Sequence, residues 1–218
     1  MKVLELFAGT RSVSKAFERK GHETYTIEFD RVHPDIDWYM DINKVEASDI
    51  VERFGIPDVV WASPPCQSYS VAAIGHHRYK GEDGELKPKT EFARQSDELL
   101  THLLKIIGDI GCRYNPNLIF FIENPRAGMR TMKCLEHYPR YTVTYCQYGD
   151  SRMKPTDIWT NHPDPKFKPA CHNGDSCHEK ASRGARTGTQ GLKGAIDRAR
   201  IPDAFCDHIC AICEEVIG

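Results

Sequence analysis

The most informative segment of the chain reads Asp58-Val59-Val60-Trp61-Ala62-Ser63-Pro64-Pro65-Cys66-Gln67-Ser68-Tyr69-Ser70. Its apolar, β-branched beginning is typical of a buried strand, and the two prolines that follow can neither continue a strand ladder nor start a helix. The segment therefore predicts a strand that ends in a stiff loop carrying Cys66. An inert cysteine usually lies inside a strand or helix, whereas Cys66 is held outside both, where an exposed nucleophile would lie.

Size and composition limit the classes of protein to consider. A chain of 218 residues, 40% of them hydrophobic, can bury one sizeable core, and we expect one α/β domain with an insertion. We expect neither a processed leader nor a membrane span, because no charged-then-apolar start or long apolar run is present. The nine cysteines are an odd number without the spacing of a disulfide framework, which favours a reducing cytoplasm.

The residues before Asp58 are typical of a nucleotide-binding unit. A strand is predicted at 2–7 and a helix at 12–20 that Ser12 can cap, with Gly9 in the turn between them. A second strand, predicted at 23–27, ends at Glu28, where an acid can bind the hydroxyls of a ribose. The turn contains a single glycine, so it is weak evidence alone, and Glu28 has the alternative role of a helix cap.

The rest of the chain continues the α/β pattern. The strand predicted at 118–122 ends in Glu123-Asn124-Pro125, so polar residues again follow a strand's carboxyl end. The polar stretch 71–89 predicts a structureless lid or binding loop. The other predicted elements are a third strand ending at Asp41-Ile42, helices at 49–54, 90–110 and 203–216, and a hairpin of strands 141–148 and 157–160. The last helix is expected to bury Phe205, Ile209, Ile212 and Val216, with Cys206, Cys210 and Cys213 packing on an adjoining face.

One basic segment stands out from an acidic chain. Residues 166–200 contain eight Lys and Arg against three Asp and Glu, although the whole chain has a net charge of -2. Such a segment favours contact with a polyanion, and a merely solvated loop is the alternative. Within it, Cys171-His172 and Cys177-His178 could hold zinc, but their spacing is unlike the common zinc-finger pattern, so we expect no metal there.

The order of these motifs resembles that of the DNA cytosine-5 methyltransferases, which use S-adenosylmethionine. The resemblance covers about residues 1–161, and the small size is similar to phage or bacterial members with a reduced target-recognition region. The matching residues are Leu6-Phe7-Ala8-Gly9 for the cofactor turn, Glu28 for the ribose acid, Asp41-Ile42 for the adenine-contacting pair, residues 63–70 for the nucleophile loop, Glu123-Asn124 for the catalytic glutamate, and Gln147 with Arg152 and Lys154 for the motif that supplies a catalytic arginine.

The resemblance implies a Rossmann-like fold with a mostly parallel sheet, and it implies roles for residues. Catalysis is assigned to Cys66, Gln67, Glu123, Asn124 and Arg152. Cofactor binding is assigned to Phe7, Gly9, Thr10, Glu28, Phe29, Asp41, Ile42 and Pro64. Contact with double-stranded DNA is assigned to Ser68, Ser70, Arg78, Lys154, Arg183, Arg186, Thr189 and Gln190. The sequence departs from the family at Arg11 and Ser12, which replace glycines, and at Lys154, which replaces an arginine.

The implied chemistry requires these residue types. Carbon 5 of cytosine becomes nucleophilic only after a thiolate, here Cys66, adds to carbon 6. The addition puts charge on N3 and O2, for which Glu123 and Arg152 are the candidates. The target base must also be flipped out of the duplex, and the loop 71–89 would close on it.

We therefore expect three parts: a catalytic domain at 1–162, a small basic target-recognition lobe at 163–202, and a helix at 203–218 that packs back on the catalytic domain. The alternatives are the same chemistry on RNA or a free pyrimidine nucleotide, and a non-catalytic DNA-binding protein with this fold. The recognised DNA sequence, a partner endonuclease as in restriction–modification, and the choice between monomer and homodimer stay open.

Overall fold

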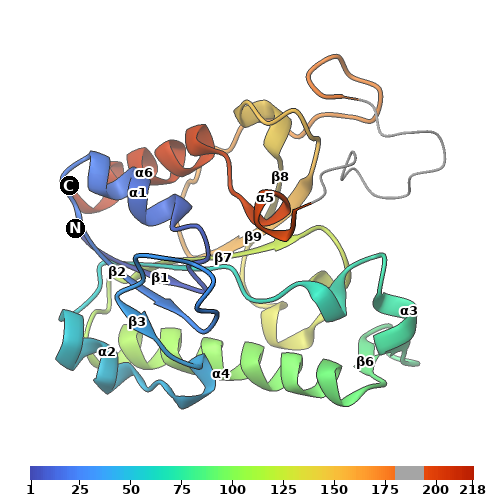
Figure 1. Ribbon diagram of the computed structural model, residues 1–218, viewed down its shortest axis with the longest axis horizontal. Coiled ribbons are helices and arrows are strands. Elements are labelled where there is room, and N and C mark those ends of the chain that lie inside the picture. The colour runs from blue at the N-terminus through green and yellow to red at the C-terminus, as the bar shows by residue number, and fades with distance from the viewer. Residues whose placement is uncertain (180–193) are drawn as a thin grey trace.

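A seven-stranded sheet forms the centre of the protein in the computed structural model, which describes residues 1–179 and 194–218 (Figure 1). The strand order is β3-β2-β1-β4-β7-β9-β8. Neighbours from β3 to β7 pair in parallel, and β9 is antiparallel to both β7 and β8. The strands are β1 (Lys2–Leu6), β2 (Glu23–Glu28), β3 (Trp38–Tyr39), β4 (Val59–Ala62), β7 (Ile119–Pro125), β8 (Arg140–Thr144) and β9 (Pro155–Thr160). The predicted α/β class with a mostly parallel sheet is confirmed.

Helices cover both faces of this sheet. Figure 1 shows α1 (Ser12–Arg19) and α6 (Asp203–Ile217) on one face, and α2 (Ala47–Phe54) and α4 (Glu91–Arg113) on the other. Strand β4 is therefore fully buried: Trp61 packs with Phe205 of α6 at 6.1 Å between ring centroids, and Val60 belongs to the core beneath α4. Burial on both sides explains why the sequence of β4 is a continuous apolar run.

The first helix begins differently from the sequence prediction. Arg11, with φ 57°, occupies the N-cap position, and Ser12 is the first helical residue. The helix start is instead bound by the buried carboxylate of Glu5, which accepts hydrogen bonds from Val13 N (3.3 Å) and Ser14 N (2.7 Å). Burial raises the pKa of Glu5 to about 7, although these hydrogen bonds act in the opposite direction. The capping role predicted for Ser12 is wrong, because a buried acid of β1 reaches the same N–H groups.

Three other segments also differ from the sequence prediction. The strand predicted at 141–148 ends at Thr144, and a 3-10 turn, η5 (Tyr145–Tyr148), follows it. The stretch 71–89 is not structureless, since it forms a short helix α3 (Ile74–His77) and a hairpin of β5 (Arg78–Lys80) and β6 (Leu86–Pro88). In α6, Val216 is 44% exposed although its apolar stripe partners are buried. The three cysteines of α6 are buried in the helix packing, as predicted.

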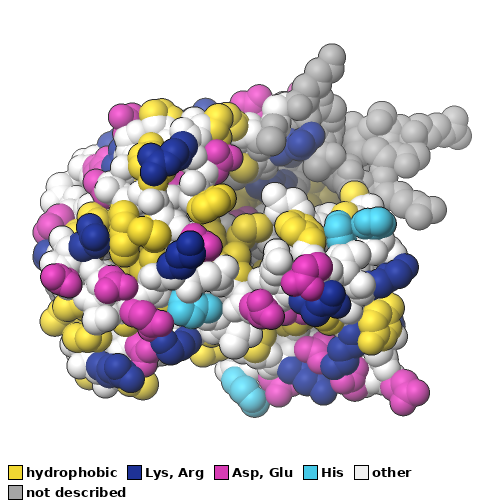
Figure 2. All heavy atoms as spheres, turned by 60° about the horizontal axis from the view of Figure 1, so that its bottom comes forward, with side chains coloured by type: hydrophobic (Ala, Val, Ile, Leu, Met, Phe, Trp, Pro, Cys, Tyr) yellow, Lys and Arg dark blue, Asp and Glu magenta, His cyan; other side chains and the backbone are white. Residues whose placement is uncertain are grey.

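The face covered by α2 and α4 carries charges of both signs (Figure 2). Along α4, Arg94 pairs with Glu91, and Lys105 and Arg113 both pair with Asp109. Along this helix, acidic side chains therefore balance these three positive side chains. The part of the chain that the structure describes contains no helix long and apolar enough to cross a membrane.

The remaining short helical segments are η1 (Ile42–Lys44), η2 (Gln67–Tyr69), η3 (Gly128–Thr131), η4 (Lys133–Leu135) and α5 (Ala195–Ala199). Of the residues assigned to DNA contact, Arg183, Arg186, Thr189 and Gln190 lie outside the described residues.

Candidate active site

The candidate site residues meet at one edge of the sheet. Strands β2, β1, β4 and β7 are parallel neighbours, so their carboxyl ends, which carry Glu28, the first turn, Cys66 and Glu123, lie side by side. Ligands of open α/β sheets bind at this edge. Hydrogen bonds connect the strand ends in sequence: Gly9 N donates to Glu28 Oε2 (2.9 Å), Ser63 N to Leu6 O (3.3 Å) and Asn124 Nδ2 to Pro64 O (2.9 Å).

The loop that carries Cys66 is anchored on both sides of the thiol. Pro64 is buried, and Ser68 and Tyr69 are buried in η2. Cys66 itself is half-buried and has φ −91° and ψ −6°, a sparsely populated region in which active-site residues often lie. The thiol is thus presented at the sheet edge by a loop that both neighbouring segments hold in place.

Cys66, Glu123 and Lys154 form one electrostatic cluster. Burial raises the pKa of the Cys66 thiol, the negative charge of Glu123 raises it further, and the positive charge of Lys154 lowers it. The pKa of Lys154 is lowered by burial, while Glu123 and Cys66 act to raise it. Glu123 and Lys154 therefore both lie close enough to Cys66 to act on its pKa, in opposite directions.

A tyrosine that sequence reasoning missed holds the acid of this cluster. Tyr145 Oη donates a hydrogen bond to Glu123 Oε1 at 3.0 Å, and both side chains are buried. The Lys154 Nζ atom lies 4.7 Å from the centroid of the Tyr145 ring. The alternation of residues 141–148 predicts a strand through Tyr145, and only the turn of η5 places its hydroxyl on Glu123, so no local signal could have identified it.

The two basic residues of the arginine motif have different surroundings. Arg152 is 4% exposed and forms a bidentate ion pair with Asp150, with Nε 2.9 Å from Oδ1 and Nη2 2.5 Å from Oδ2. The catalytic role assigned to Arg152 does not fit this geometry, because Asp150 uses its guanidinium. Lys154 is the cation that acts on Cys66 and Glu123. Its Nζ also donates to the Arg198 carbonyl at 2.9 Å.

The turn after β1 has an unusual backbone. Phe7, Gly9 and Arg11 have positive φ values of 56°, 49° and 57°, a conformation that costs a non-glycine residue about 1 kcal/mol or more. Glu28 stabilises the turn by accepting the backbone N–H of Gly9. The same carboxylate also accepts the N–H groups of Phe29 (2.8 Å) and Asp30 (3.0 Å).

Several residues assigned from the sequence lie elsewhere. Arg78 and Ser68 are 3% and 0% exposed and hydrogen-bond to each other, so the DNA contacts assigned to them do not fit their burial. Ile42 is 2% exposed in the core, which does not fit a contact with adenine, whereas Asp41 caps η1 by accepting from Asn43 N. Of the residues assigned to catalysis or DNA contact beside Cys66, Gln67 is exposed and Ser70 is half-buried.

Comparison with known proteins identifies the family. Residues 1–135 match the family model of C-5 cytosine-specific DNA methylases. The chain belongs to this family. It is 30% identical over 231 residues, 98% of this chain and all of the relative, to a protein of Frog virus 3 (isolate Goorha) named probable DNA (cytosine-5)-methyltransferase.

A solved structure shows the same fold for this methylase. The S. pombe Dnmt2 methyltransferase matches with a TM-score of 0.50 and 16% identity over 73% of this chain. A Spodoptera frugiperda DNMT2 mutant matches with a TM-score of 0.47 and 17% identity over 78% of it. The methylase spans 48% and 53% of the lengths of these two chains. The predicted methyltransferase fold is confirmed.

The described residues at the sheet edge fit S-adenosylmethionine, the methyl donor of the family. Glu28 would supply a carboxylate for the ribose, and the Phe29 side chain, 73% exposed at the same strand end, would offer an apolar surface for adenine. Arg11 Nε is buried without a hydrogen-bond partner among the described residues. Arg11 stands where the family usually has a glycine, whose backbone would contact the carboxylate of the cofactor. The unpaired guanidinium N–H of Arg11 is suited to bind that carboxylate instead.

Proposed function

We propose that this methylase transfers a methyl group to carbon 5 of a flipped-out cytosine in double-stranded DNA, through a covalent adduct with Cys66. The observation that carries the proposal is the cluster of Cys66, Glu123 and Lys154 at the carboxyl edge of the sheet, where the charges of Glu123 and Lys154 both act on the pKa of Cys66. A thiol, an acid and a cation are the groups that nucleophilic addition to a pyrimidine ring requires.

In the proposed reaction the Cys66 thiolate adds to carbon 6, and the electron pair of the ring moves toward N3 and O2. The Glu123 carboxylate accepts the proton that leaves Cys66 and passes it to N3, so the site gains no net charge. S-adenosylmethionine, when bound, supplies the methyl group. The proton on N3 then returns to Glu123 and water takes the proton from carbon 5. Expulsion of the Cys66 thiolate restores the aromatic ring.

We assign the cation at O2 to Lys154 rather than to Arg152. Lys154 acts on Cys66 and Glu123, whereas the guanidinium of Arg152 is paired with Asp150. Tyr145 orients Glu123 by donating to Oε1, which leaves Oε2 for the base. Arg152 is a positioning residue in this scheme, because its ion pair fixes the loop from which Lys154 projects.

The proposal includes the way in which DNA is engaged. Cys66 cannot reach a stacked base, so the target is flipped out at a cost of a few kcal/mol. We assign target recognition to residues 163–202, catalysis to the domain at 1–162, and the closing of that domain to the helix at 203–218. The enzyme acts as a monomer or homodimer in the cytoplasm, where its nine free cysteines stay reduced.

A trapped adduct tests nucleophile, substrate and position together. Duplex DNA containing 5-fluorocytosine is incubated with the enzyme and S-adenosylmethionine, and the covalent complex is digested and sequenced by mass spectrometry. Fluorine at carbon 5 cannot leave as a cation, so the adduct should persist and map to Cys66. Cys66→Ala should give no adduct, and Cys112→Ser, which changes an exposed cysteine of α4, should give the wild-type yield.

A methyl-transfer assay distinguishes between the candidate substrates. Methyl transfer to duplex DNA is compared with transfer to transfer RNA and to free dCMP under identical conditions. Transfer to RNA or dCMP alone would overturn the choice of DNA but keep the chemistry. An adduct on another cysteine, or methylation by Cys66→Ala, would overturn the mechanism.

A further inference from the structure

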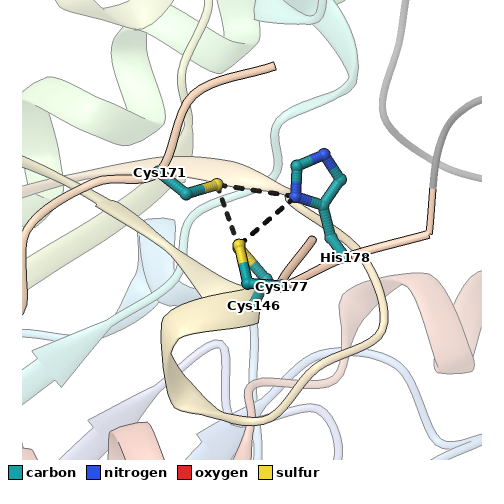
Figure 3. A group of neighbouring side chains, drawn as sticks. All are labelled: Cys146, Cys171, Cys177 and His178. Atoms are coloured by element: carbon teal, nitrogen blue, oxygen red, sulfur yellow. Dashed lines mark hydrogen bonds between the residues drawn. The ribbon is translucent and has the colours of Figure 1, made fainter. Parts of the chain in front are cut away.

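Four metal-ligating side chains converge outside the active site. Cys146 lies in η5, and Cys171, Cys177 and His178 come from the segment that follows β9 (Figure 3). Their ligand atoms all lie within 4.8 Å of one another. Two segments about 25 residues apart in the sequence thus bring three thiols and one imidazole to a single point.

Three of the distances within the cluster lie close to the edges of a zinc tetrahedron, and the Cys146–Cys171 distance is shorter. Zinc bonds of about 2.3 Å to sulfur and 2.0–2.1 Å to nitrogen give S–S edges of about 3.8 Å and S–N edges of about 3.6 Å. Here Cys146 Sγ lies 3.1 Å from Cys171 Sγ and 3.6 Å from Cys177 Sγ. His178 Nδ1 lies 3.7 Å from Cys171 Sγ and 3.5 Å from Cys177 Sγ. No sulfur pair within the cluster is at the bonding distance of a disulfide, about 2.05 Å.

The surroundings of the cluster suit thiolate ligands. Cys146 and Cys171 are buried, and Gln147 Nε2 donates to Cys177 Sγ at 3.4 Å. Cys171 N donates to Thr144 Oγ1 at 3.0 Å, which fixes the segment against the end of β8. Such outer hydrogen bonds orient the ligands of structural metal sites.

We propose that Cys146, Cys171, Cys177 and His178 bind one zinc ion as a closed structural site. Three sulfurs and one imidazole nitrogen are a common zinc donor set, and a complete set of four protein ligands leaves no position for a substrate. From the sequence the candidate ligands are two Cys-His pairs, Cys171-His172 and Cys177-His178, and their spacing is unlike that of the common zinc finger. In the structure His172 of the first pair is exposed and lies outside the cluster, and the fourth ligand is Cys146.

The site has a defined structural task. It joins the second half of the segment 163–179, which has little apolar core of its own, to the loop between β8 and β9. Just beyond the cluster, Glu179 N donates to Ser151 O at 2.8 Å, next to Arg152. Zinc would therefore fix the start of the proposed recognition lobe beside the loop that carries Arg152 and Lys154.

Metal content tests the proposal directly. The full-length protein, purified reduced and without a polyhistidine tag, should contain about one zinc per chain by elemental analysis. Cobalt(II) in place of zinc should give the intense visible absorption of a tetrahedral thiolate site. Removal of the metal with a chelator should lower the melting temperature, and added zinc should restore it. A wild-type protein that neither contains nor takes up zinc, or that has a Cys146–Cys171 disulfide, would overturn the proposal.

Paired variants locate the ligands. His178→Ala should lose most of the zinc, whereas His172→Ala, which changes the neighbouring histidine outside the cluster, should keep the wild-type content. His178→Cys should retain zinc, because four thiolates form an equally good site. Equal zinc loss from the His172 and His178 variants would refute the assignment. None of these measurements depends on methyl transfer, so the zinc site and the proposed function can fail separately.

Discussion

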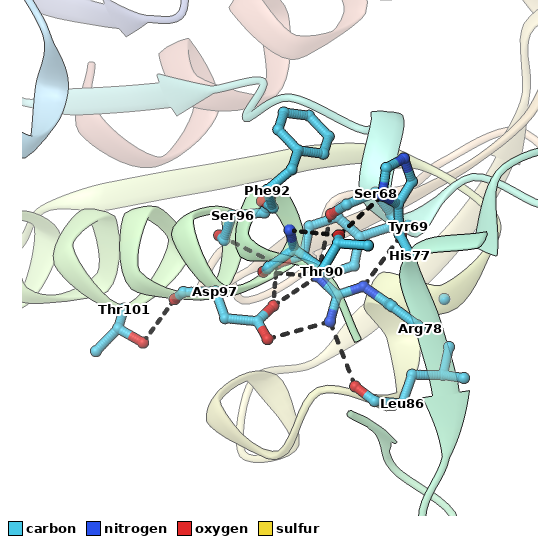
Figure 4. A network of polar contacts seen from close by, with 12 residues as sticks. Ser68, Tyr69, His77, Arg78, Leu86, Thr90, Phe92, Ser96, Asp97 and Thr101 are labelled. Atoms are coloured by element: carbon cyan, nitrogen blue, oxygen red, sulfur yellow. Dashed lines mark hydrogen bonds and ion pairs between the residues drawn. The ribbon is translucent and has the colours of Figure 1, made fainter. Parts of the chain in front are cut away.

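Replacing Arg78 by alanine is expected to destabilise the whole fold rather than to remove a DNA contact. The Arg78 guanidinium lies between the hairpin β5–β6, the nucleophile loop and α4 (Figure 4). Its Nη2 donates to Asp97 Oδ1 (2.7 Å) and Ser68 Oγ (3.0 Å), and its Nε donates to Ser68 O (3.0 Å). The guanidinium also stacks 4.0 Å from the centroid of the Tyr69 ring.

The magnitude follows from burial. Removing one partner of a buried ion pair costs about 3–5 kcal/mol, because the other charge is left unpaired. The Arg78 side chain is fully buried, but that of Asp97 is 21% exposed and water can solvate part of its charge. The lower end of the range, about 3 kcal/mol, therefore applies. In a chain of this size the melting temperature should fall by about 6–12 °C.

The assay is urea unfolding followed by circular dichroism, together with DNA affinity measured well below the melting temperature. Lys80→Ala is the matched control, since Lys80 is an exposed cation on the same strand β5, and its unfolding free energy should change by less than about 0.5 kcal/mol. If Arg78→Ala unfolds like the wild type and only loses DNA affinity, the anchoring role is refuted.

Three further outcomes are expected. Lys154→Met should raise the pKa of Cys66, slow the alkylation of Cys66 by iodoacetamide at pH 8 and reduce the rate of methyl transfer about 10²–10³-fold. Lys154→Arg should keep most activity, and unchanged alkylation in Lys154→Met would contradict the effect of Lys154 on Cys66. The pKa of Glu5, 4.5 in the unfolded chain and about 7 when folded, means that its protonated form favours the fold. Its contribution to the unfolding free energy, about 3 kcal/mol in total, is present below pH 4.5 and is lost as pH rises through 7. Glu5→Gln should therefore flatten the fall in unfolding free energy between pH 5 and 7.5. Parallel pH profiles of the variant and the wild type would refute this. Asn124→Ala removes the hydrogen bond to Pro64 O and should lower the unfolding free energy by about 1–3 kcal/mol. It should slow adduct formation but leave cofactor affinity, measured by calorimetry, unchanged; a loss of cofactor affinity would refute a role confined to the nucleophile loop.

The Arg152–Asp150 pair shows why a motif alone does not decide which of its two cations faces the base. The two cations of the motif are two residues apart, and from the sequence either can be the one that faces the base. The bidentate fit of Asp150 with a guanidinium distinguishes them, because a carboxylate binds arginine in a fixed planar geometry that lysine cannot form.

The linear sequence was sufficient for the order of the central-sheet strands and the main helices, and for the edge at which the site lies. Apolar periodicity is a local property, and parallel strands necessarily bring their carboxyl ends together, so the sequence alone places Glu28, Cys66 and Glu123 near one another. The partners of long polar side chains could not be derived in this way. Arg78 turns inward to Asp97, and Cys146 joins cysteines from beyond β9. Such choices depend on which distant segments pack within hydrogen-bonding range, and only the folded chain determines those distances.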